Sequence, residues 1–470
     1  MEIALNIVNK INEYLSDYIL LILLIGCGLY FTIRTRFVQV RCFGEGMKKV
    51  FGSFSMNGGK KEGGLSSFQA LATAISAQVG TGNIVGACGA ILVGGPGAIF
   101  WMWVIAFFGM ATIYAEATLA IKTREVSEDG SIQGGPVYYI KKAYKGKLGK
   151  FLAGFFAVST TCALGFMGTM VQSNSIAETM ETAFSIPGWV IGLVLVVISA
   201  FIFIGGIKRI ASVTEKIVPI MAGLYLLLGL VMLGFNVKFI PETFGLIFKY
   251  AFMPQAILGG SVGMALKTAI SQGAKRGLFS NEAGMGSTPH AHAMANVKDP
   301  HEQGIVAMVG VFIDTFVVLT MTALVVISTF YVRLEGNLAD VTKTNMLQKA
   351  FATLFGTTAG NILVAICLFF FAFSTIISWN FFGKVNFNYL FGKKATIVYT
   401  VIAIGFIFLG SLFPNDLVWA LTDMFNNLMV IPNVLAIVPL ASLVIACAKI
   451  SKKSGSADLL DADSTENNNG

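Results

Sequence analysis

The chain contains few charged residues for its length. Aspartate, glutamate, lysine and arginine together make up 12% of its 470 residues, whereas 55% are hydrophobic. Soluble domains usually carry about a quarter of their residues as charges, so this composition excludes an ordinary soluble protein and indicates a polytopic membrane protein. The net charge of +8 does not indicate nucleic-acid binding, because the basic residues gather in short segments between apolar runs.

Motifs for metal, redox or nucleotide chemistry are scarce. The six cysteines are scattered and none lies in a CxxC pair, so their spacing indicates neither a zinc site nor a disulfide framework. His290 and His292 form an HxH pair, but no third ligand is nearby in the sequence, which disfavours a metal site there. The sequence has no GxxxxGK[ST] motif, which disfavours a pump driven by ATP. No cleavable signal peptide is predicted.

One apolar stretch, residues 65–97, is interrupted in its middle by Gly80-Thr81-Gly82-Asn83. A glycine-rich kink at membrane depth is tolerated only where the freed backbone is buried or faces a polar cavity. The helix that begins after such a break presents N–H groups that suit a carboxylate, and the helix before it presents carbonyls that suit sodium. The stretch therefore predicts a shared site for a carboxylate and a cation. A glycine-lined helix crossing is the structural alternative.

Eleven apolar spans are predicted, with the N-terminus outside and the C-terminus in the cytoplasm. Basic residues concentrate at 34–61 and 122–150, which the positive-inside rule places in the cytoplasm. We expect a multi-pass protein of the cell membrane whose lipid bilayer is its main partner, and whose acidic tail is disordered. The predicted spans are 18–33, 65–97, 97–121, 151–177, 187–207, 217–237, 256–293, 304–332, 350–383, 395–414 and 416–448.

A short repeat relates the two halves of the chain. The letters LATAIS at 71–76 recur as LKTAIS at 266–271, and each copy lies in a glycine-interrupted stretch. Five spans separate the copies, so the second half is predicted to have inverted topology, an arrangement typical of secondary transporters. The predicted units are an extra N-terminal helix and cytoplasmic loop (1–64), a first five-helix repeat (65–237), a second five-helix repeat (238–450) and a disordered cytoplasmic tail (451–470).

Two motifs resemble the signature of a known family. QVGTGNIVG at 78–86 and RGLFSNEAGMG at 276–286 are similar to the signature of the alanine or glycine:cation symporter family, and the resemblance extends over nearly the whole chain. It implies an all-α membrane protein of about eleven transmembrane helices, with a leucine-transporter-like 5+5 inverted repeat and one extra N-terminal helix. It also implies sodium-coupled import of small neutral amino acids, alanine or glycine, by alternating access.

The resemblance places substrate binding at Asn83 and Gln172 and pocket walls at Thr375 and Trp379. Backbone N–H groups at Thr81, Gly82 and Asn83 suit the carboxylate of an amino acid. The side chains of Asn83 and Gln172 are neutral, which suits a substrate without net charge. An amide inside a span can instead bond to a neighbouring helix, and that alternative stays open for Gln172.

Thr375 and Trp379 lie one turn apart on the same face of a predicted helix. A tryptophan beside a small amino acid would cap the pocket and limit the size of the side chain. The hydroxyls of Ser374 and Thr375, with carbonyls near Ala77 and Gly80, are the predicted ligands of a coupling sodium ion. The structural alternative is that these hydroxyls bond back to their own helix.

Two other functions, a channel and a membrane enzyme, fit the sequence less well than a symporter. A channel usually has a pore-lining polar stripe or a charged ring, and the sequence has no repeated acidic ring. A membrane enzyme would need a catalytic group at depth, yet the intramembrane acids Glu116, Asp314 and Asp423 have no evident His or Cys partner. Glu116 is predicted to have a structural role. The chain is therefore predicted not to be an enzyme.

Overall fold

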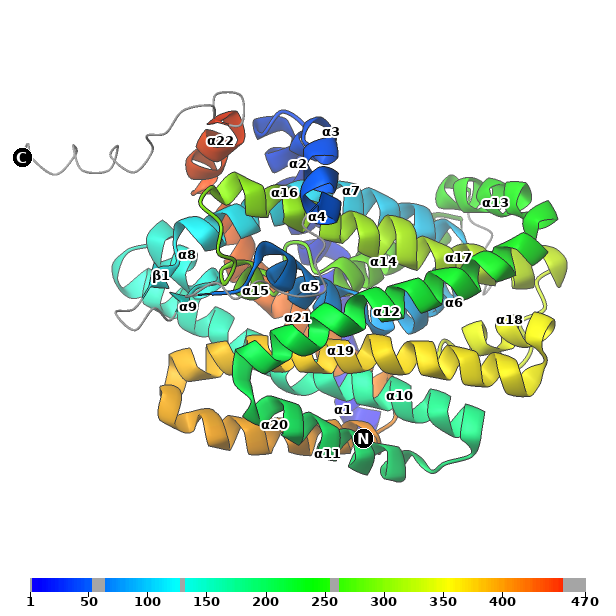
Figure 1. The fold of residues 1–470 in the computed structure, drawn as a ribbon. Coiled ribbons are helices and arrows are strands. Elements are labelled where there is room, and N and C mark those ends of the chain that lie inside the picture. Colours follow the sequence, from blue (N-terminus) through cyan, green and yellow to red (C-terminus); the bar gives the residue numbers. More distant parts are fainter. Residues whose placement is uncertain (1, 53–63, 127–131, 254–261, 451–470) are drawn as a thin grey trace, which may run out of the picture.

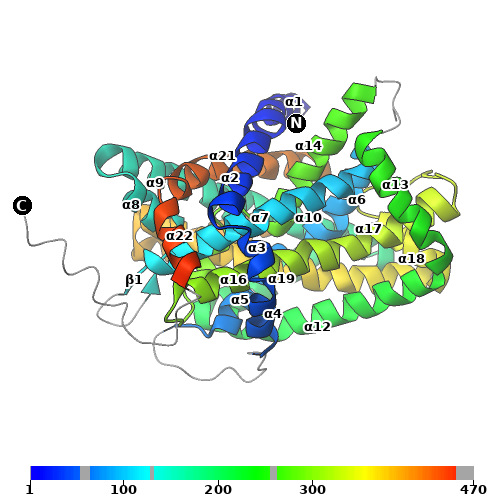
Figure 2. The same ribbon diagram turned by 90° about the horizontal axis from the view of Figure 1, so that it is seen from above.

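The computed structural model describes residues 2–52, 64–126, 132–253 and 262–450, and most of these residues lie in helices. One small hairpin pairs β1 (Glu125–Val126) antiparallel with β2 (Ile132–Gln133), with Glu125 opposite Gln133. The long helices run side by side as a bundle (Figure 1), and the view from above shows α1–α2 crossing them steeply (Figure 2). The all-α expectation is confirmed. The tail that was predicted to be disordered lies outside the described residues.

The first half contains the following elements: α1 (Glu2–Tyr14), η1 (Leu15–Leu20), α2 (Leu21–Arg34), α3 (Val38–Arg41), α4 (Phe43–Gly52), α5 (Ser67–Gln78), η2 (Gly82–Gly86), α6 (Ala87–Gly94), α7 (Gly97–Lys122), α8 (Pro136–Ala143), α9 (Gly146–Thr160), η3 (Thr161–Gly168), α10 (Thr169–Phe184), α11 (Gly188–Ile204) and α12 (Gly206–Phe235). The second half contains η4 (Val237–Phe239), α13 (Ile240–Phe252), α14 (Val262–Asn281), α15 (Pro289–His292), α16 (Pro300–Val311), η5 (Phe312–Leu319), α17 (Thr320–Ile327), η6 (Ser328–Arg333), α18 (Met346–Phe355), α19 (Thr357–Phe391), η7 (Lys393–Ala395), α20 (Thr396–Gly410), α21 (Asn415–Ile437) and α22 (Ala441–Ile450).

Among the described residues, eight continuous helices are long and apolar enough to cross a membrane. They are Ile3–Arg34, Gly97–Lys122, Gly146–Phe184, Gly206–Phe235, Pro300–Arg333, Thr357–Phe391, Lys393–Gly410 and Asn415–Ile437. The bent pair α5 and η2–α6 makes a ninth if it is counted as one span. A total of eleven would also require α11 and α14, so that number stays a prediction, as do the boundaries of the two repeats.

Outward-facing apolar side chains agree with a membrane environment. Val197 and Phe201 of α11 are 64% and 70% exposed, and Ile397 of α20 is 75% exposed. Exposing such large apolar side chains to water is unfavourable in free energy, whereas lipid tails solvate them well. The chain is therefore a multi-pass membrane protein.

The first interrupted helix has the predicted break. Ser66 begins α5 with a capping box, in which its hydroxyl accepts the N–H of Gln69 and the Gln69 side chain accepts the N–H of Ser66. The helix ends at Gln78, and the chain turns by 44° before η2 begins at Gly82. The break lies between α19, η5 and α14 of the second half and α10 of the first half.

A helix interruption in the second half follows α14, whereas the glycines at 259 and 260 lie outside the described residues. α14 runs without a break from Val262 to Asn281, and the chain leaves the helix at Glu282, Gly284 and Gly286, which have positive φ angles of 58°, 93° and 75°. The glycines of residues 277–289 predict a cytoplasmic glycine-rich segment there. Its first five residues instead belong to α14, and its remaining residues are buried. LATAIS ends two residues before the end of α5, whereas LKTAIS ends ten residues before the end of α14. The two copies therefore lie at different distances from the ends of their helices.

Candidate functional site

Two glycines let three helices meet at the break. A Cβ atom on Gly80 would overlap the hydroxyl of Thr375 on α19 and would lie 3.2 Å from Oε1 of Gln172 on α10. A Cβ atom on Gly82 would lie 2.9 Å from the Cα atom of Ser280 on α14. Only glycine permits this close approach, so the signature glycines are where the two halves of the chain touch.

An oxygen cluster lies on one side of the break. The hydroxyl of Thr375 donates to the carbonyls of Ser76 and Phe371 at 2.9 and 3.1 Å, and it lies 3.4 Å from the carbonyl of Ala77. The hydroxyl of Ser374 donates to the same carbonyls of Phe371 and Ser76, at 2.9 and 3.3 Å. Three of the four predicted sodium residues, Ala77, Ser374 and Thr375, are thus together, and the two hydroxyls bond both back to α19 and across to α5. The carbonyl of Gly80, the fourth, instead accepts the N–H of Asn83 at 3.3 Å. Sequence reasoning missed Ser76 and Phe371, because a backbone carbonyl carries no residue-specific signal.

The predicted substrate residues Thr81 and Gln172 also meet at the break. Oε1 of Gln172 accepts the backbone N–H of Thr81 at 3.2 Å. Within the described residues, the hydroxyl of Thr81 and the Nε2 atom of Gln172 are buried and have no hydrogen-bond partner. An unsatisfied buried polar group costs about 1–3 kcal/mol, so both atoms favour a polar ligand at this point.

The side chain of Asn83 is hydrogen-bonded within the protein at both of its polar atoms. Its Oδ1 atom accepts the N–H of Gly80 at 2.9 Å, and its Nδ2 atom donates to the Asp314 carboxylate at 2.6 Å. The hydroxyls of Ser280 and Thr315 also donate to Asp314, at 3.0 and 2.8 Å. This buried carboxylate on η5 is a site residue that the sequence marked only as an intramembrane acid. Its spacing from Asn83 along the chain gave no signal that the two would meet.

Trp379 forms an aromatic wall with a residue that sequence reasoning did not single out. Its indole lies 5.6 Å from the ring of Phe279 at an interplanar angle of 76°, and its Nε1 atom donates to the carboxylate of Glu282. A Cβ atom on Gly168 would overlap the indole ring. Since Thr375 is one turn away on α19, the indole and the oxygen cluster belong to one face of that helix.

Glu116 holds the second interruption in place. Its carboxylate accepts the N–H groups of Gly284 and Gly286 at 3.0 and 2.9 Å, and it also accepts Nδ2 of Asn433 on α21. Asn433 in turn accepts the hydroxyl of Tyr139 on α8. These contacts satisfy the backbone freed by the turn, so Glu116 has the structural role that was predicted.

An ion pair lies next to the aromatic wall. Arg276 of α14 donates twice to the carboxylate of Asp423 on α21, at 3.0 and 2.9 Å. The guanidinium lies 4.5 Å from the ring centroid of Trp419, which itself lies 4.7 Å from Phe279. A bidentate pair of this kind is strong and geometrically specific. It ties α14 to α21 beside the predicted substrate residues.

The two histidines of the HxH pair already have partners. Nδ1 of His290 lies 2.7 Å from the carbonyl of Ser287, and its Nε2 lies 2.9 Å from Asn386. Nδ1 of His292 lies 2.7 Å from Gln303. A cavity of about 580 Å³ beside His290 is lined by residues of α8, α12 and α19, and it contains none of the predicted substrate or sodium residues.

The fold and the broken helix define a class of protein, which the comparison with solved structures supports. The chain superimposes on the crystal structure of MhsT in complex with L-phenylalanine with a TM-score of 0.58, over 83% of this chain and 99% of that one, at 15% identity. This likeness shows the fold alone, which is that of leucine-transporter-type secondary transporters. Together with the family membership given next, this fold makes the chain a transporter and not an enzyme.

The family follows from the sequence comparisons. The model of the sodium:alanine symporter family matches residues 1–461, and the chain belongs to that family. The sodium/alanine symporter AgcS of Methanococcus maripaludis is 41% identical over 445 residues, which cover 94% of this chain and 96% of that protein. GlnT of Bacillus subtilis, designated a candidate sodium/glutamine symporter, is 37% identical over 473 residues, which cover 100% of this chain and 96% of that protein.

Proposed function

We propose that this protein is a sodium-coupled symporter that imports small neutral amino acids, alanine or glycine, by alternating access. The observation that carries the proposal is the pair of unpartnered polar groups on Thr81 and Gln172, at the same helix break as the oxygen cluster of Ser374 and Thr375. A ligand with both a donor and an acceptor would satisfy both groups. The α-ammonium and α-carboxylate of an amino acid supply them.

The chemistry of each group sets its role. Nε2 of Gln172 is a donor and suits the carboxylate of the substrate, whereas the hydroxyl of Thr81 can accept from its ammonium. The positive end of η2, which begins at Gly82, adds to the attraction for the carboxylate. Trp379 and Phe279 offer an apolar wall to a short side chain. The polar groups of the site suit the backbone of an amino acid, and little of its chemistry is directed at a polar side chain.

Sodium coupling is supported by the five oxygens of the cluster. The hydroxyl of Thr375 lies within 3.4 Å of the carbonyls of Ser76, Ala77 and Phe371. The hydroxyl of Ser374 lies within 3.3 Å of the carbonyls of Ser76 and Phe371. Each hydroxyl now donates to a carbonyl, and a rotation about its C–O bond would turn the oxygen lone pairs toward a cation. An ion there would fix the end of α5, three residues before Thr81, whose backbone N–H is bonded to Gln172. Ion and substrate would then favour the same arrangement of the break, which is the basis of coupling.

The test is uptake of labelled alanine into proteoliposomes that contain the purified full-length chain. We expect accumulation with an inward sodium gradient, and none with potassium or a proton gradient alone. We also expect counterflow, in which unlabelled alanine inside the vesicle drives labelled alanine inward, as a carrier allows and a channel does not. Competition by glycine but not by glutamine would support the small-substrate assignment. Uptake driven equally well by protons, or stronger competition by glutamine, would contradict it.

A further inference from the structure

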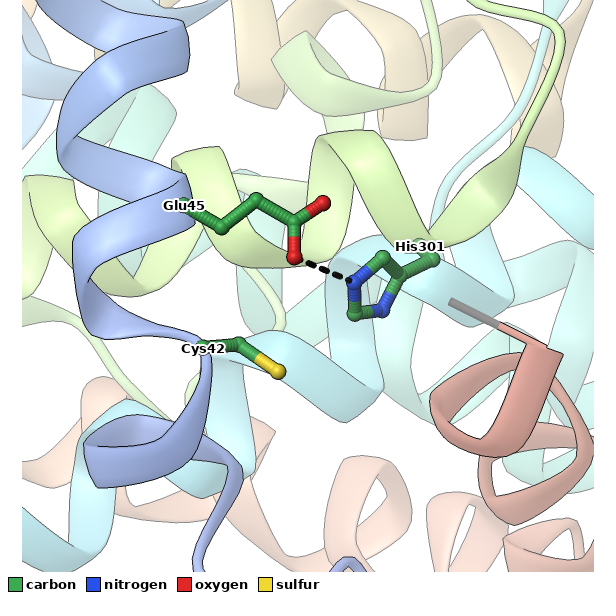
Figure 3. A group of neighbouring side chains, drawn as sticks. All are labelled: Cys42, Glu45 and His301. Atoms are coloured by element: carbon green, nitrogen blue, oxygen red, sulfur yellow. Dashed lines mark ion pairs between the residues drawn. The ribbon is translucent and has the colours of Figure 1, made fainter. Parts of the chain in front are cut away.

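A group of three potential metal ligands lies far from the helix break. Cys42 connects α3 to α4, Glu45 lies in the first turn of α4, and His301 is the second residue of α16. Figure 3 shows the three side chains pointing toward one another. Their ligand atoms all lie within 4.8 Å of each other, and Oε2 of Glu45 lies 3.7 Å from Nε2 of His301.

One ligand atom is buried without a hydrogen bond. Nε2 of His301 has no hydrogen-bond partner in the described part of the chain, although His301 is only 1% exposed. The other ring nitrogen, Nδ1, lies 2.7 Å from the hydroxyl of Tyr114 on α7. Tyr114 therefore fixes the ring and directs Nε2 toward Glu45 and Cys42. This is how a second group usually orients a histidine that binds a metal.

We propose that Cys42, Glu45 and His301 form a binding site for a divalent transition metal, of which zinc is the best match. Zinc takes thiolate, imidazole and carboxylate ligands in tetrahedral geometry at about 2.0–2.3 Å, which puts neighbouring ligand atoms roughly 3.3–3.7 Å apart. The observed nitrogen–oxygen separation of 3.7 Å already fits, and the sulfur of Cys42 lies within 4.8 Å of both atoms.

The donor set selects the kind of metal. Calcium and magnesium prefer oxygen ligands only, so a sulfur and a nitrogen disfavour them. When the metal–sulfur bond forms, the Cys42 thiol releases its proton to solvent. The thiolate and the Glu45 carboxylate then balance the two positive charges of the metal, so the bound site has no net charge. Glu45 has a side chain that is 43% exposed, which gives the metal a path of entry and leaves water as its fourth ligand.

The site would fasten α4 onto α16. These helices pack against each other beside α7 (Figure 2), and Lys49 of α4 already pairs with Glu302 of α16 at 2.7 Å. A metal ion would add a second connection one turn away. Since α16 continues into η5, which holds Asp314, the bound metal would stabilise the scaffold behind the helix break.

The experiment uses the full-length protein, purified in detergent and stripped with a chelator, then titrated with cobalt and with zinc. We expect one metal per chain by elemental analysis, and a cobalt–thiolate charge-transfer band in the near ultraviolet. Cys42→Ser should abolish that band, and Glu45→Gln should weaken cobalt binding roughly tenfold or more. Cys162→Ser is the matched control, because Cys162 lies in η3 outside the group, and it should leave the titration unchanged.

A melting experiment separates lost binding from lost folding. Without metal, Cys42→Ser should melt at the same temperature as the parent protein, because serine nearly matches cysteine in shape. With zinc in excess, the parent should melt at a higher temperature and Cys42→Ser should not, since a ligand stabilises only the form that binds it. A cobalt band that persists in Cys42→Ser, equal zinc stabilisation of both proteins, or no stoichiometric metal would overturn the proposal and leave Glu45 and His301 as an ion pair only.

Discussion

The side-chain oxygen of Gln172 accepts the backbone N–H of Thr81 at 3.2 Å, which joins the first turn of α10 to the break after α5. The same amide leaves its Nε2 atom buried and unpartnered in the described part of the chain. Gln172 therefore does two things at once. Its Oε1 atom fixes the backbone of the break at Thr81, and its Nε2 atom can donate a hydrogen bond to a ligand bound beside Thr81.

Gln172→Ala should raise the alanine concentration for half-maximal uptake. The substitution removes a donor to the substrate and also leaves the N–H of Thr81 unpaired, which costs about 1–3 kcal/mol, or roughly 5- to 150-fold in affinity. The measurement is the concentration dependence of sodium-driven uptake. Glu181→Gln, an exposed change on the same helix, is the control and should have no effect. An unchanged half-saturation in Gln172→Ala would make Gln172 a helix-packing amide only.

Thr375→Ala should raise the sodium concentration for half-maximal uptake by roughly tenfold, a loss of about 1.4 kcal/mol. The alanine lacks the hydroxyl that lies against the Ser76 carbonyl and would serve as a sodium ligand. Thr375→Ser keeps that hydroxyl and should stay near the parent value. Both are measured as sodium dependence at fixed alanine. If Thr375→Ala and Thr375→Ser behave alike, the sodium site does not include this hydroxyl.

Trp379→Leu should admit larger neutral amino acids such as valine and leucine. The indole fills space beside Phe279, and discrimination by one or two methylene groups is typically about 1–3 kcal/mol, or roughly 10- to 200-fold. Competition of labelled alanine uptake by a series of amino acids measures the ranking. Because Trp379 also donates to Glu282, Trp379→Phe is the control that loses the donor but keeps an aromatic ring. A size ranking that stays the same in Trp379→Leu would show that Trp379 only packs.

Asn83→Ala should reduce transport of every amino acid by a similar factor and leave the size ranking unchanged. The reason is that Asn83 connects Gly80 to Asp314, so its loss disturbs the break itself and not one wall of the pocket. It should also destabilise the protein by about 1–3 kcal/mol, since Asp314 loses a buried donor. Uptake of a panel of amino acids and thermal melting together test this. A selective loss of one substrate would contradict it.

Orientation can be tested with single cysteines labelled by an impermeant reagent. The basic segment at 122–150 is predicted to be cytoplasmic, so a cysteine at exposed Lys142 should react only after the cytoplasmic side is opened. A cysteine at exposed Ala339, between η6 and α18, should react from outside on intact cells. The unsubstituted protein gives the background of its native cysteines. The reversed pattern would place the N-terminus in the cytoplasm.

Sequence alone was enough for the class of membrane protein and for the first break. The apolar composition and the glycines at 80 and 82 act locally, because glycine weakens a helix wherever it stands. The motif around these glycines indicated the family, and the family resemblance indicated most of the predicted pocket residues. In the structure, Thr81, Gln172 and Thr375 lie close together at the break. The turn at Glu282 had no sequence signal of its own, because the Glu116 carboxylate that accepts the freed N–H groups of Gly284 and Gly286 is far away in the sequence.

What only the tertiary structure decided is which distant groups meet. Asp314 accepts hydrogen bonds from Asn83, Ser280 and Thr315, and Trp379 packs against Phe279. No local sequence pattern predicts these contacts. The same holds for the group of Cys42, Glu45 and His301. Because His301 is far from Cys42 in the sequence, the spacing of the cysteines could not predict it. The amino-acid sequence determined the helices and the places where they weaken, since those properties depend on neighbours within a turn or two. Packing of the whole bundle determined the sites, because each one is assembled from carbonyls and side chains of several helices.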